Sequence, residues 1–164
     1  MSLSVAVLAF VTLQRLGELV LARRNTARLM ARGAVEVSPG HYPAIVVLHA
    51  AWLGGLWWFA WDRPANLALL AVFAGLQAMR LWVLATLGER WTTRIIVLPG
   101  APLVTTGPYR FLSHPNYAVV AAEIAVLPAV FGLYAYAVAF SILNAAVLAL
   151  RIRAENGALV SSAR

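Results

Sequence analysis

The sequence predicts an all-α integral membrane protein with five transmembrane helices, the last two forming a helical hairpin. Hydrophobic residues make up 62 % of its 164 residues and charged residues only 12 %, whereas soluble domains carry about 25 % charged and about 45–50 % apolar residues. The hydrophobic residues form four long apolar stretches separated by arginine-containing segments. These observations exclude a disordered chain, a disulfide-stabilised scaffold and most soluble domains of this length.

Each expected helix corresponds to one apolar stretch or to half of one. Residues 2–22, 43–61 and 65–87 match the ~20 residues that cross a bilayer. Residues 115–150 exceed one span, and Gly132, which follows Pro128 near their middle, is typical of a tight turn. We therefore expect a helical hairpin there. The first helix is not expected to be a cleaved signal peptide, because its charged residues lie in its second half.

The placement of arginine predicts the orientation. All thirteen basic residues are arginine, and ten lie between the first two helices, between the third and fourth, or after the fifth. The opposite side has only Arg63, and Arg15 and Arg80 lie within spans. Because excess Lys and Arg marks cytoplasmic loops, we expect the N-terminus outside, the C-terminus in the cytoplasm and both long loops cytoplasmic.

We expect the net charge of +7 to interact with the membrane surface rather than with a nucleic acid. A nucleic-acid-binding protein clusters its basic residues on a polar face, which this chain lacks. Arg24, Arg28 and Arg32 recur every four residues, as suits a basic stripe at the headgroup surface of anionic membrane lipids. We therefore expect membrane lipids as partners and no nucleic acid.

Charged side chains inside the expected spans are candidate functional or paired residues. Glu123 lies in the fourth helix, where a carboxylate is costly unless it is paired or functional. Asn116 lies seven residues earlier and therefore on the same helix face. Two interpretations are open: Glu123 contacts a substrate, or it neutralises Arg80 or Arg15. The spacing of Arg15 and Glu18 also permits an ion pair within the first helix.

The fifth helix has a second polar stripe. Asn144, Arg151 and Glu155 are spaced by seven and four residues and share one face. Arg151 and Glu155 form either part of a site or a simple i, i+4 pair. The chain has no cysteine, and the spacing of its three histidines (His41, His49 and His114) is not that of metal ligands. We therefore expect no metal.

The segment 98–117, LPGAPLVTTGPYRFLSHPNY, is the most informative part of the chain. Its Gly, Pro and Thr content predicts an ordered cytoplasmic loop rather than a membrane helix. Its end is a plausible helix start, since Ser113 can cap a helix and Pro115 suits a first turn. The N–H groups of such a helix start can bind an anionic group.

The run LVTTGPYRFLSHPNY, a carboxylate-bearing membrane helix and then RIRAEN at residues 151–156 resemble the isoprenylcysteine carboxyl methyltransferase family. The resemblance covers residues 90–159 and implies a membrane enzyme that uses S-adenosylmethionine and releases S-adenosylhomocysteine. RLGELVLARRN and HYPAIVVLHAAWL are more similar to a bacterial branch. Members of that branch often accompany type III polyketide synthases and methylate phenolic or pyrone lipids.

The resemblance implies a role for each matching residue. Leu103 and Val104 would contact the cofactor through their backbones, Tyr109 would shape its pocket, and Arg151 would be the catalytic residue that reaches the acceptor. Glu123 is kept as a second candidate for the acceptor site. The chain departs from the family pattern at Ser113, where Arg is usual, and it has a shorter tail and Asn156, where a second Glu is frequent. The implied cofactor-binding residues, which include the His-Pro-x-Tyr element and a glutamate, are Ala101, Pro102, Leu103, Val104, Tyr109, His114, Pro115, Asn116, Tyr117 and Glu155.

With this resemblance, residues 1–164 are expected to form one membrane methyltransferase domain. Residues 1–87 would hold three helices with a basic cytoplasmic loop at 23–42, and residues 88–164 the cofactor-binding loop, the hairpin and the tail. The expected location is the bacterial cytoplasmic membrane, with the active site facing the cytoplasm. The expected function is methyl transfer to an oxygen of a lipophilic acceptor. The alternatives are a phospholipid or amine N-methyltransferase and a non-enzymatic membrane scaffold.

Overall fold

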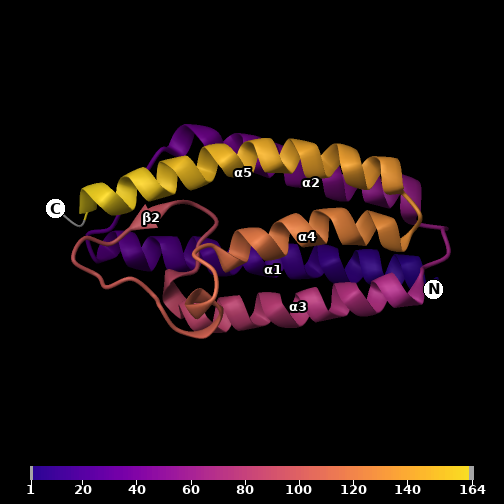
Figure 1. The fold of residues 1–164 in the computed structure, drawn as a ribbon, viewed down its shortest axis with the longest axis horizontal. Helices are drawn as coiled ribbons and strands as arrows, with labels where there is room; N and C mark the ends of the chain where they lie inside the picture. The colour runs from indigo at the N-terminus through magenta and orange to yellow at the C-terminus, as the bar shows by residue number, and fades with distance from the viewer. Residues whose placement is uncertain (1, 163–164) are drawn as a thin grey trace.

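The computed structural model describes residues 2–162, and the side chains of all of these except His41 and residues 156–162. Five α-helices run side by side along one long axis (Figure 1). They are connected by short turns at one end and by long loops at the other. We call the end with residues 61–66 and 131–133 the turn end, and the end with residues 32–41 and 88–114 the loop end. The helices are α1 (Leu3–Ala31), α2 (Tyr42–Ala60), α3 (Leu67–Leu87), α4 (Pro115–Val130) and α5 (Tyr134–Ser162).

The helices agree with an all-α membrane protein. Within the described residues, four helices are long and apolar enough to cross a membrane, namely α1, α2, α3 and α5. The fourth in sequence, α4, is apolar but has only 16 residues, about 24 Å of helix against a hydrocarbon core of about 30 Å. Four candidate spans are therefore found, and the fifth span stays a prediction.

The expected hairpin is formed by α4 and α5, which pack side by side (Figure 1). Gly132 makes the turn with φ +72°, and the N–H of Leu133 donates to the carbonyl of Pro128. A positive φ costs glycine nothing but strains other residues. The turn is also fastened to the neighbouring one, because the N–H of Asn66 donates to the carbonyl of Val130 at 2.8 Å.

The expected loop at residues 23–42 is too long, because α1 continues to Ala31. The prediction is therefore wrong for residues 23–31. Tertiary contacts extend this helix beyond the apolar stretch. The side-chain amide of Asn25 donates to the carbonyls of Gly88 and Trp91, at 3.2 and 2.8 Å, and Arg28 pairs with Glu89 at 2.8 Å. Helix α5 likewise continues past Leu150, where the apolar stretch ends.

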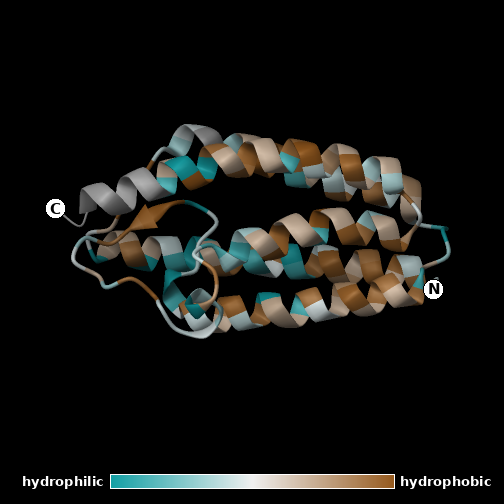
Figure 2. Ribbon diagram, in the orientation of Figure 1, coloured by the Kyte–Doolittle hydropathy of each residue, from teal (hydrophilic) through white to brown (hydrophobic). Residues whose placement is uncertain are grey.

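Polar and apolar side chains have an inverted distribution over much of the bundle. Many large hydrophobic side chains face outward, such as Trp58 at 78 % exposure, while Glu123 is fully buried. Figure 2 shows hydrophobic residues along all the helices, and hydrophilic ones toward the loop end and at a connection of the turn end. A lipid environment accounts for this pattern. Outward-facing apolar side chains would contact lipid, and a polar side chain is least costly inside the bundle, where it meets other polar groups. An apolar core of Leu8, Trp52, Leu56, Ile124, Leu127 and Phe131 holds the helices together.

The loop end is an ordered structure rather than a set of free connections. Strands β1 (Val35–Glu36) and β2 (Ile96–Val97) pair antiparallel, and Arg94 of the second loop pairs with Glu36 of the first at 2.9 Å. Three 3₁₀ turns, η1 (Pro39–His41), η2 (Gly88–Arg90) and η3 (Gly107–Arg110), complete it. Gly107 has φ +56°, and a Cβ there would lie 2.4 Å from Oγ1 of Thr86, so η3 sits tightly on α3.

Candidate functional site

The candidate site lies at the loop end, where the first turn of α4 meets the later part of α5. Its centre is the Tyr117 hydroxyl, which donates to Oε2 of Glu155 at 2.5 Å and accepts from Nε of Arg151 at 2.8 Å. The Arg151 guanidinium also lies 5.4 Å from the centre of the Tyr117 ring. One phenol therefore bridges a cation and a carboxylate that stand one helical turn apart.

His114, the residue that directly precedes α4, is the fourth member of this group. Its Nδ1 lies 3.8 Å from Oε2 of Glu155, and its ring stacks on Tyr117 with centres 5.3 Å apart. Pro115 is the first residue of α4, where its missing N–H would lack an intrahelical partner in any case. The local sequence thus brings His114 and Tyr117 to one side of a helix start. We call His114, Tyr117, Arg151 and Glu155 the Tyr117 site.

The Tyr117 site is partly shielded from solvent. Arg151 is 7 % exposed, while the Glu155 side chain is 28 % exposed and reaches the surface. Nearby in η3, burial and then the charge of Glu155 raise the pKa of Tyr109 to about 12, so Tyr109 is a neutral phenol at pH 7. Of the three guanidinium nitrogens of Arg151, only Nε forms a hydrogen bond to a described residue. Both terminal amino groups of its guanidinium can therefore bind a planar anion.

The alternative of a direct Arg151–Glu155 pair is not what the geometry shows. No ion pair within 4.0 Å joins these two side chains among the described residues; the Tyr117 hydroxyl lies between them. The i, i+4 spacing places both side chains on one face, and Tyr117 from α4 contacts both. Sequence reasoning assigned Tyr117 to the cofactor but did not foresee this bridging role. The signal for it is the antiparallel hairpin, which brings the start of α4 to the cytoplasmic half of α5 in the predicted topology.

The remaining expected cofactor residues are only partly brought to this site. Pro115 is buried, and Asn116 has a buried Oδ1 without a hydrogen-bond partner among the described residues. Residues 101–104 form a separate segment, in which the Pro102 carbonyl accepts from Arg90 at 2.5 Å and Leu103 is 68 % exposed. No hydrogen bond links residues 101–104 to the Tyr117 site within the described part of the chain. Their cofactor roles stay predictions, and the side chain of Asn156 lies outside the described residues.

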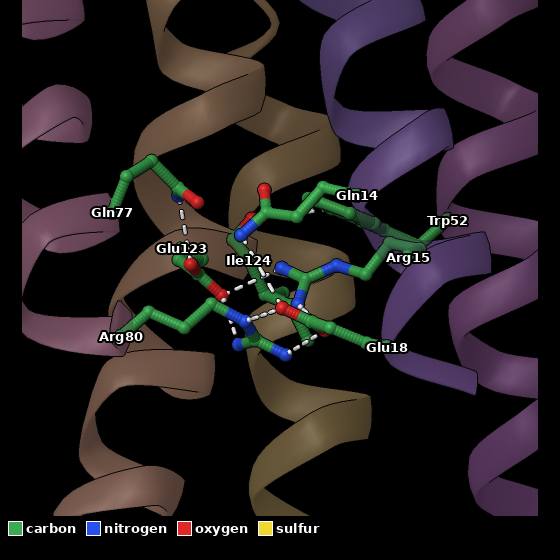
Figure 3. Close-up of polar contacts among 8 residues, drawn as sticks. All are labelled: Gln14, Arg15, Glu18, Trp52, Gln77, Arg80, Glu123 and Ile124. Atoms are coloured by element: carbon green, nitrogen blue, oxygen red, sulfur yellow. Dashed lines mark hydrogen bonds and ion pairs between the residues drawn. The ribbon is translucent and has the colours of Figure 1, made fainter. Parts of the chain in front are cut away.

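Glu123 lies apart from the Tyr117 site, six residues further along α4, or about 9 Å. Its Oε2 accepts from Arg15 Nη2 at 2.7 Å and from Arg80 Nη1 at 2.8 Å, and its Oε1 accepts from Gln77 at 2.8 Å (Figure 3). Both oxygens are thus occupied by the protein itself. The structure places Glu123 in the neutralising arrangement, and within the described part of the chain no hydrogen bond or ion pair joins it to the candidate acceptor residue Arg151.

The other half of this arrangement is Glu18. Arg80 donates through Nε and Nη2 to both oxygens of Glu18, each at 2.5 Å, and Arg15 donates to Glu18 at 3.0 Å. Sequence reasoning named these pairs separately and missed that they merge. The available signal was composition, since each of these four charges lies within an otherwise apolar predicted span. We call this group the charge cluster; its members are Gln14, Arg15, Glu18, Gln77, Arg80 and Glu123.

Comparison with known proteins gives two matches. The model of the isoprenylcysteine carboxyl methyltransferase (ICMT) family matches residues 67–161, a segment that contains the whole Tyr117 site. A protein of Bacillus subtilis (strain 168), named Uncharacterized protein YpbQ, is 38 % identical over 165 residues, covering 93 % of this chain and 94 % of that protein. No solved structure matches the chain.

Proposed function

The chain belongs to the isoprenylcysteine carboxyl methyltransferase family, and on that premise we propose that it transfers a methyl group from S-adenosylmethionine to an oxygen of a lipophilic acceptor. The observation that supports this proposal is the Tyr117 site, in which one hydroxyl holds Arg151 and Glu155. A carboxylate suited to a cationic ligand and a guanidinium suited to an anionic one then stand one turn apart. Methyl transfer from a sulfonium to an oxyanion joins a cationic donor to an anionic acceptor, and this pair of charges matches the two.

The chain's own residues fit the cofactor at the start of α4. S-adenosylmethionine supplies the electrophilic methyl group when it is bound. Glu155, which is partly exposed, is suited to bind a cationic or hydroxyl group of that ligand, and the buried Oδ1 of Asn116 is an acceptor without a partner among the described residues. His114 and Tyr117 would form an aromatic wall. Residues 101–104 would close the site from the loop.

Arg151 would orient the acceptor. Its two terminal amino groups match a carboxylate or a phenolate, and a guanidinium near such a group favours its deprotonated form. Because Arg151 is nearly buried, water is largely excluded around the anion, and removal of water strengthens the attraction. An amine acceptor has less use for a cation at this position, so the geometry favours oxygen over nitrogen.

The proposed setting is the bacterial cytoplasmic membrane, with α4 as the fifth span and the loop end in the cytoplasm. The water-borne cofactor would reach the Tyr117 site from the loop end, and the lipid acceptor would enter laterally between helices. The acceptor itself is open: a prenylcysteine, a phenolic lipid and a pyrone lipid all present a suitable oxygen. The similarity to enzymes that accompany type III polyketide synthases stays a prediction.

Two measurements on the detergent-purified protein test the proposed function. Calorimetric titration with S-adenosylhomocysteine should give saturable one-site binding, and absence of binding would contradict the proposal in favour of a scaffold. Labelled S-adenosylmethionine is then offered with prenylcysteine, phenolic lipid or phosphatidylethanolamine. Label in either of the first two supports oxygen transfer, and label confined to phosphatidylethanolamine would replace it with nitrogen transfer.

A further inference from the structure

The charge cluster joins two parts of the chain that the family match separates. Arg80 and Glu123 lie within residues 67–161, whereas Arg15 and Glu18 lie on α1, outside that segment. Two guanidiniums and two carboxylates balance to zero charge, and Figure 3 shows them converging from α1, α3 and α4. Burial of these charges costs desolvation energy, so the cluster by itself is weak evidence for a gain in stability. Its geometry instead indicates that it holds α4 in place.

Glu123 is the residue through which the cluster holds α4. Its carboxylate receives hydrogen bonds from α1 through Arg15 and from α3 through Arg80 and Gln77. Arg15 and Arg80 are in turn both bound to Glu18. The position of the Glu123 carboxylate is therefore set jointly by α1 and α3. Removal of the two α1 charges would leave it with contacts to α3 only.

Among the described residues, Glu123 is the α4 side chain that is hydrogen-bonded to α1 and α3, and such a contact opposes rotation of α4 about its own axis. The other hydrogen bonds between described residues that tie α4 to α2 and to the cap of α3 use its backbone carbonyls, from Trp52 to Ile124 at 3.3 Å and from Asn66 to Val130 at 2.8 Å. A backbone carbonyl lies close to the helix axis and resists rotation weakly. Tyr117 lies in the first turn of the same helix. Its hydroxyl makes two short hydrogen bonds there, and a small rotation of α4 would lengthen them.

We propose that Arg15 and Glu18 are positioning residues for the Tyr117 site: they act through Glu123 to hold α4 in the rotation that brings the Tyr117 hydroxyl between Arg151 and Glu155. The cofactor-binding role of the Tyr117 site rests on the proposed function, but the positioning itself does not. The first helix is then part of the working enzyme and not only an anchor in the membrane.

The test removes the two α1 charges together. Loss of one partner leaves an uncompensated buried charge and endangers folding, whereas the double variant R15M/E18Q keeps the cluster neutral, with Arg80 still paired to Glu123. The control is Leu8→Ala on the same helix, a fully buried residue of the apolar core outside the cluster. Both proteins are studied well below their melting temperatures, with melting curves to compare their loss of stability.

Two readouts are taken. Hydrogen exchange of backbone amides in residues 113–120 needs no ligand, and we expect it to accelerate in R15M/E18Q and to stay near wild type in L8A. Calorimetry with S-adenosylhomocysteine should show affinity at least tenfold weaker in R15M/E18Q and within threefold of wild type in L8A. R15K, which keeps the charge balance of the cluster, should bind S-adenosylhomocysteine more tightly than R15M/E18Q does.

The outcomes separate the two proposals. Unchanged exchange at residues 113–120 in R15M/E18Q, or an equal change in L8A, would overturn the positioning role. Wild-type affinity for S-adenosylhomocysteine in R15M/E18Q would overturn it as well. If the wild-type protein itself does not bind S-adenosylhomocysteine, the proposed function fails, and the exchange measurement still decides whether Arg15 and Glu18 hold the start of α4.

Discussion

A single hydroxyl organises the candidate site at the scale of residues. Tyr117 donates to a carboxylate and accepts from a guanidinium, so one hydroxyl holds both neighbouring side chains in place. Hydrogen bonds to charged groups are stronger than neutral ones. The two neighbours also differ in burial, since Glu155 reaches the surface and Arg151 is nearly buried. This difference agrees with the separate roles proposed for them, Glu155 for the cofactor and Arg151 for the acceptor. Substitutions at these positions should therefore have separable effects.

Tyr117→Phe tests the bridge. The substitution removes only the hydroxyl, so Arg151 and Glu155 lose their common partner while the ring remains. We expect S-adenosylhomocysteine affinity to fall by about 1.5–3 kcal/mol, the typical contribution of a hydrogen bond to a charged group, as measured by calorimetry. Tyr136→Phe is the matched control, since the Tyr136 hydroxyl bonds to the Ala51 and Trp52 carbonyls on α2. Equal losses in the two variants would remove Tyr117 from the cofactor site.

Arg151→Lys tests the acceptor role. Lysine keeps the charge but loses the planar pair of donors. Turnover should fall because the activation free energy rises by about 2–4 kcal/mol, since such an interaction strengthens in the transition state. The affinity for S-adenosylhomocysteine should change little. Rates and calorimetric affinities are measured on the same preparation. Near-normal turnover, or an affinity defect as large as the rate defect, would exclude Arg151 from the acceptor site.

Tyr109 gives a prediction about pH. Because burial raises its pKa to about 12, from about 10 in an unfolded chain, the folded protein binds its proton more tightly than the unfolded chain does. Its contribution to stability is therefore complete below pH 10 and is lost as the pH rises from 10 to 12. The melting temperature of Tyr109→Phe should fall less over that interval than that of the wild type. Identical pH curves for the two proteins would contradict the assignment.

At the scale of elements, the sequence predicted which helices form but not where all of them end. Apolar length located all five helices, and Gly132 located the hairpin turn. The end of α1 was missed because contacts of Asn25 and Arg28 with η2, not apolar residues, extend it. The pairing of β1 with β2 was also unforeseen, since two-residue strands have no periodicity to detect. Tertiary contacts decided each of these features.

The candidate site shows the same division. The resemblance selected His114, Tyr117, Arg151 and Glu155, and the structure brings these four together. It could not show that Glu123 is committed to other partners, because the three residues that bond its carboxylate come from two other helices, α1 and α3. Registration of helices in depth is a property of packing, and no single stretch of sequence encodes it.

Gly107 gives a prediction for η3. Gly107→Ala adds a Cβ 2.4 Å from Oγ1 of Thr86 to a residue at φ +56°, whereas Gly100→Ala adds one in open space at φ +74°. Both variants incur the left-handed penalty of about 1–2 kcal/mol, and only Gly107→Ala adds the steric clash. Its melting temperature should be the lower of the two, and Thr86→Ala should recover the difference. Equal melting temperatures would show that η3 shifts without cost.

At the scale of the whole molecule, the orientation of the bundle is the main open prediction. Cysteines introduced singly at Arg24 and Thr105, exposed positions near or in the loop end, should resist membrane-impermeant thiol reagents in intact cells. A cysteine at Asp62, exposed at the turn end, should react. The native chain has no cysteine to interfere. Reaction at Thr105 from outside would reverse the topology and separate the Tyr117 site from cytoplasmic S-adenosylmethionine.

The short length of α4 has a consequence for the surrounding bilayer. If α4 spans, its 16 residues cover about 6 Å less than the usual hydrocarbon thickness, and a short hydrophobic segment thins the lipid beside it. Headgroups and water would then dip toward the start of α4, so that a water-borne donor and a lipid-borne acceptor could meet without either leaving its own phase. Methyl transfer should accordingly slow in vesicles of longer acyl chains and quicken in those of shorter ones.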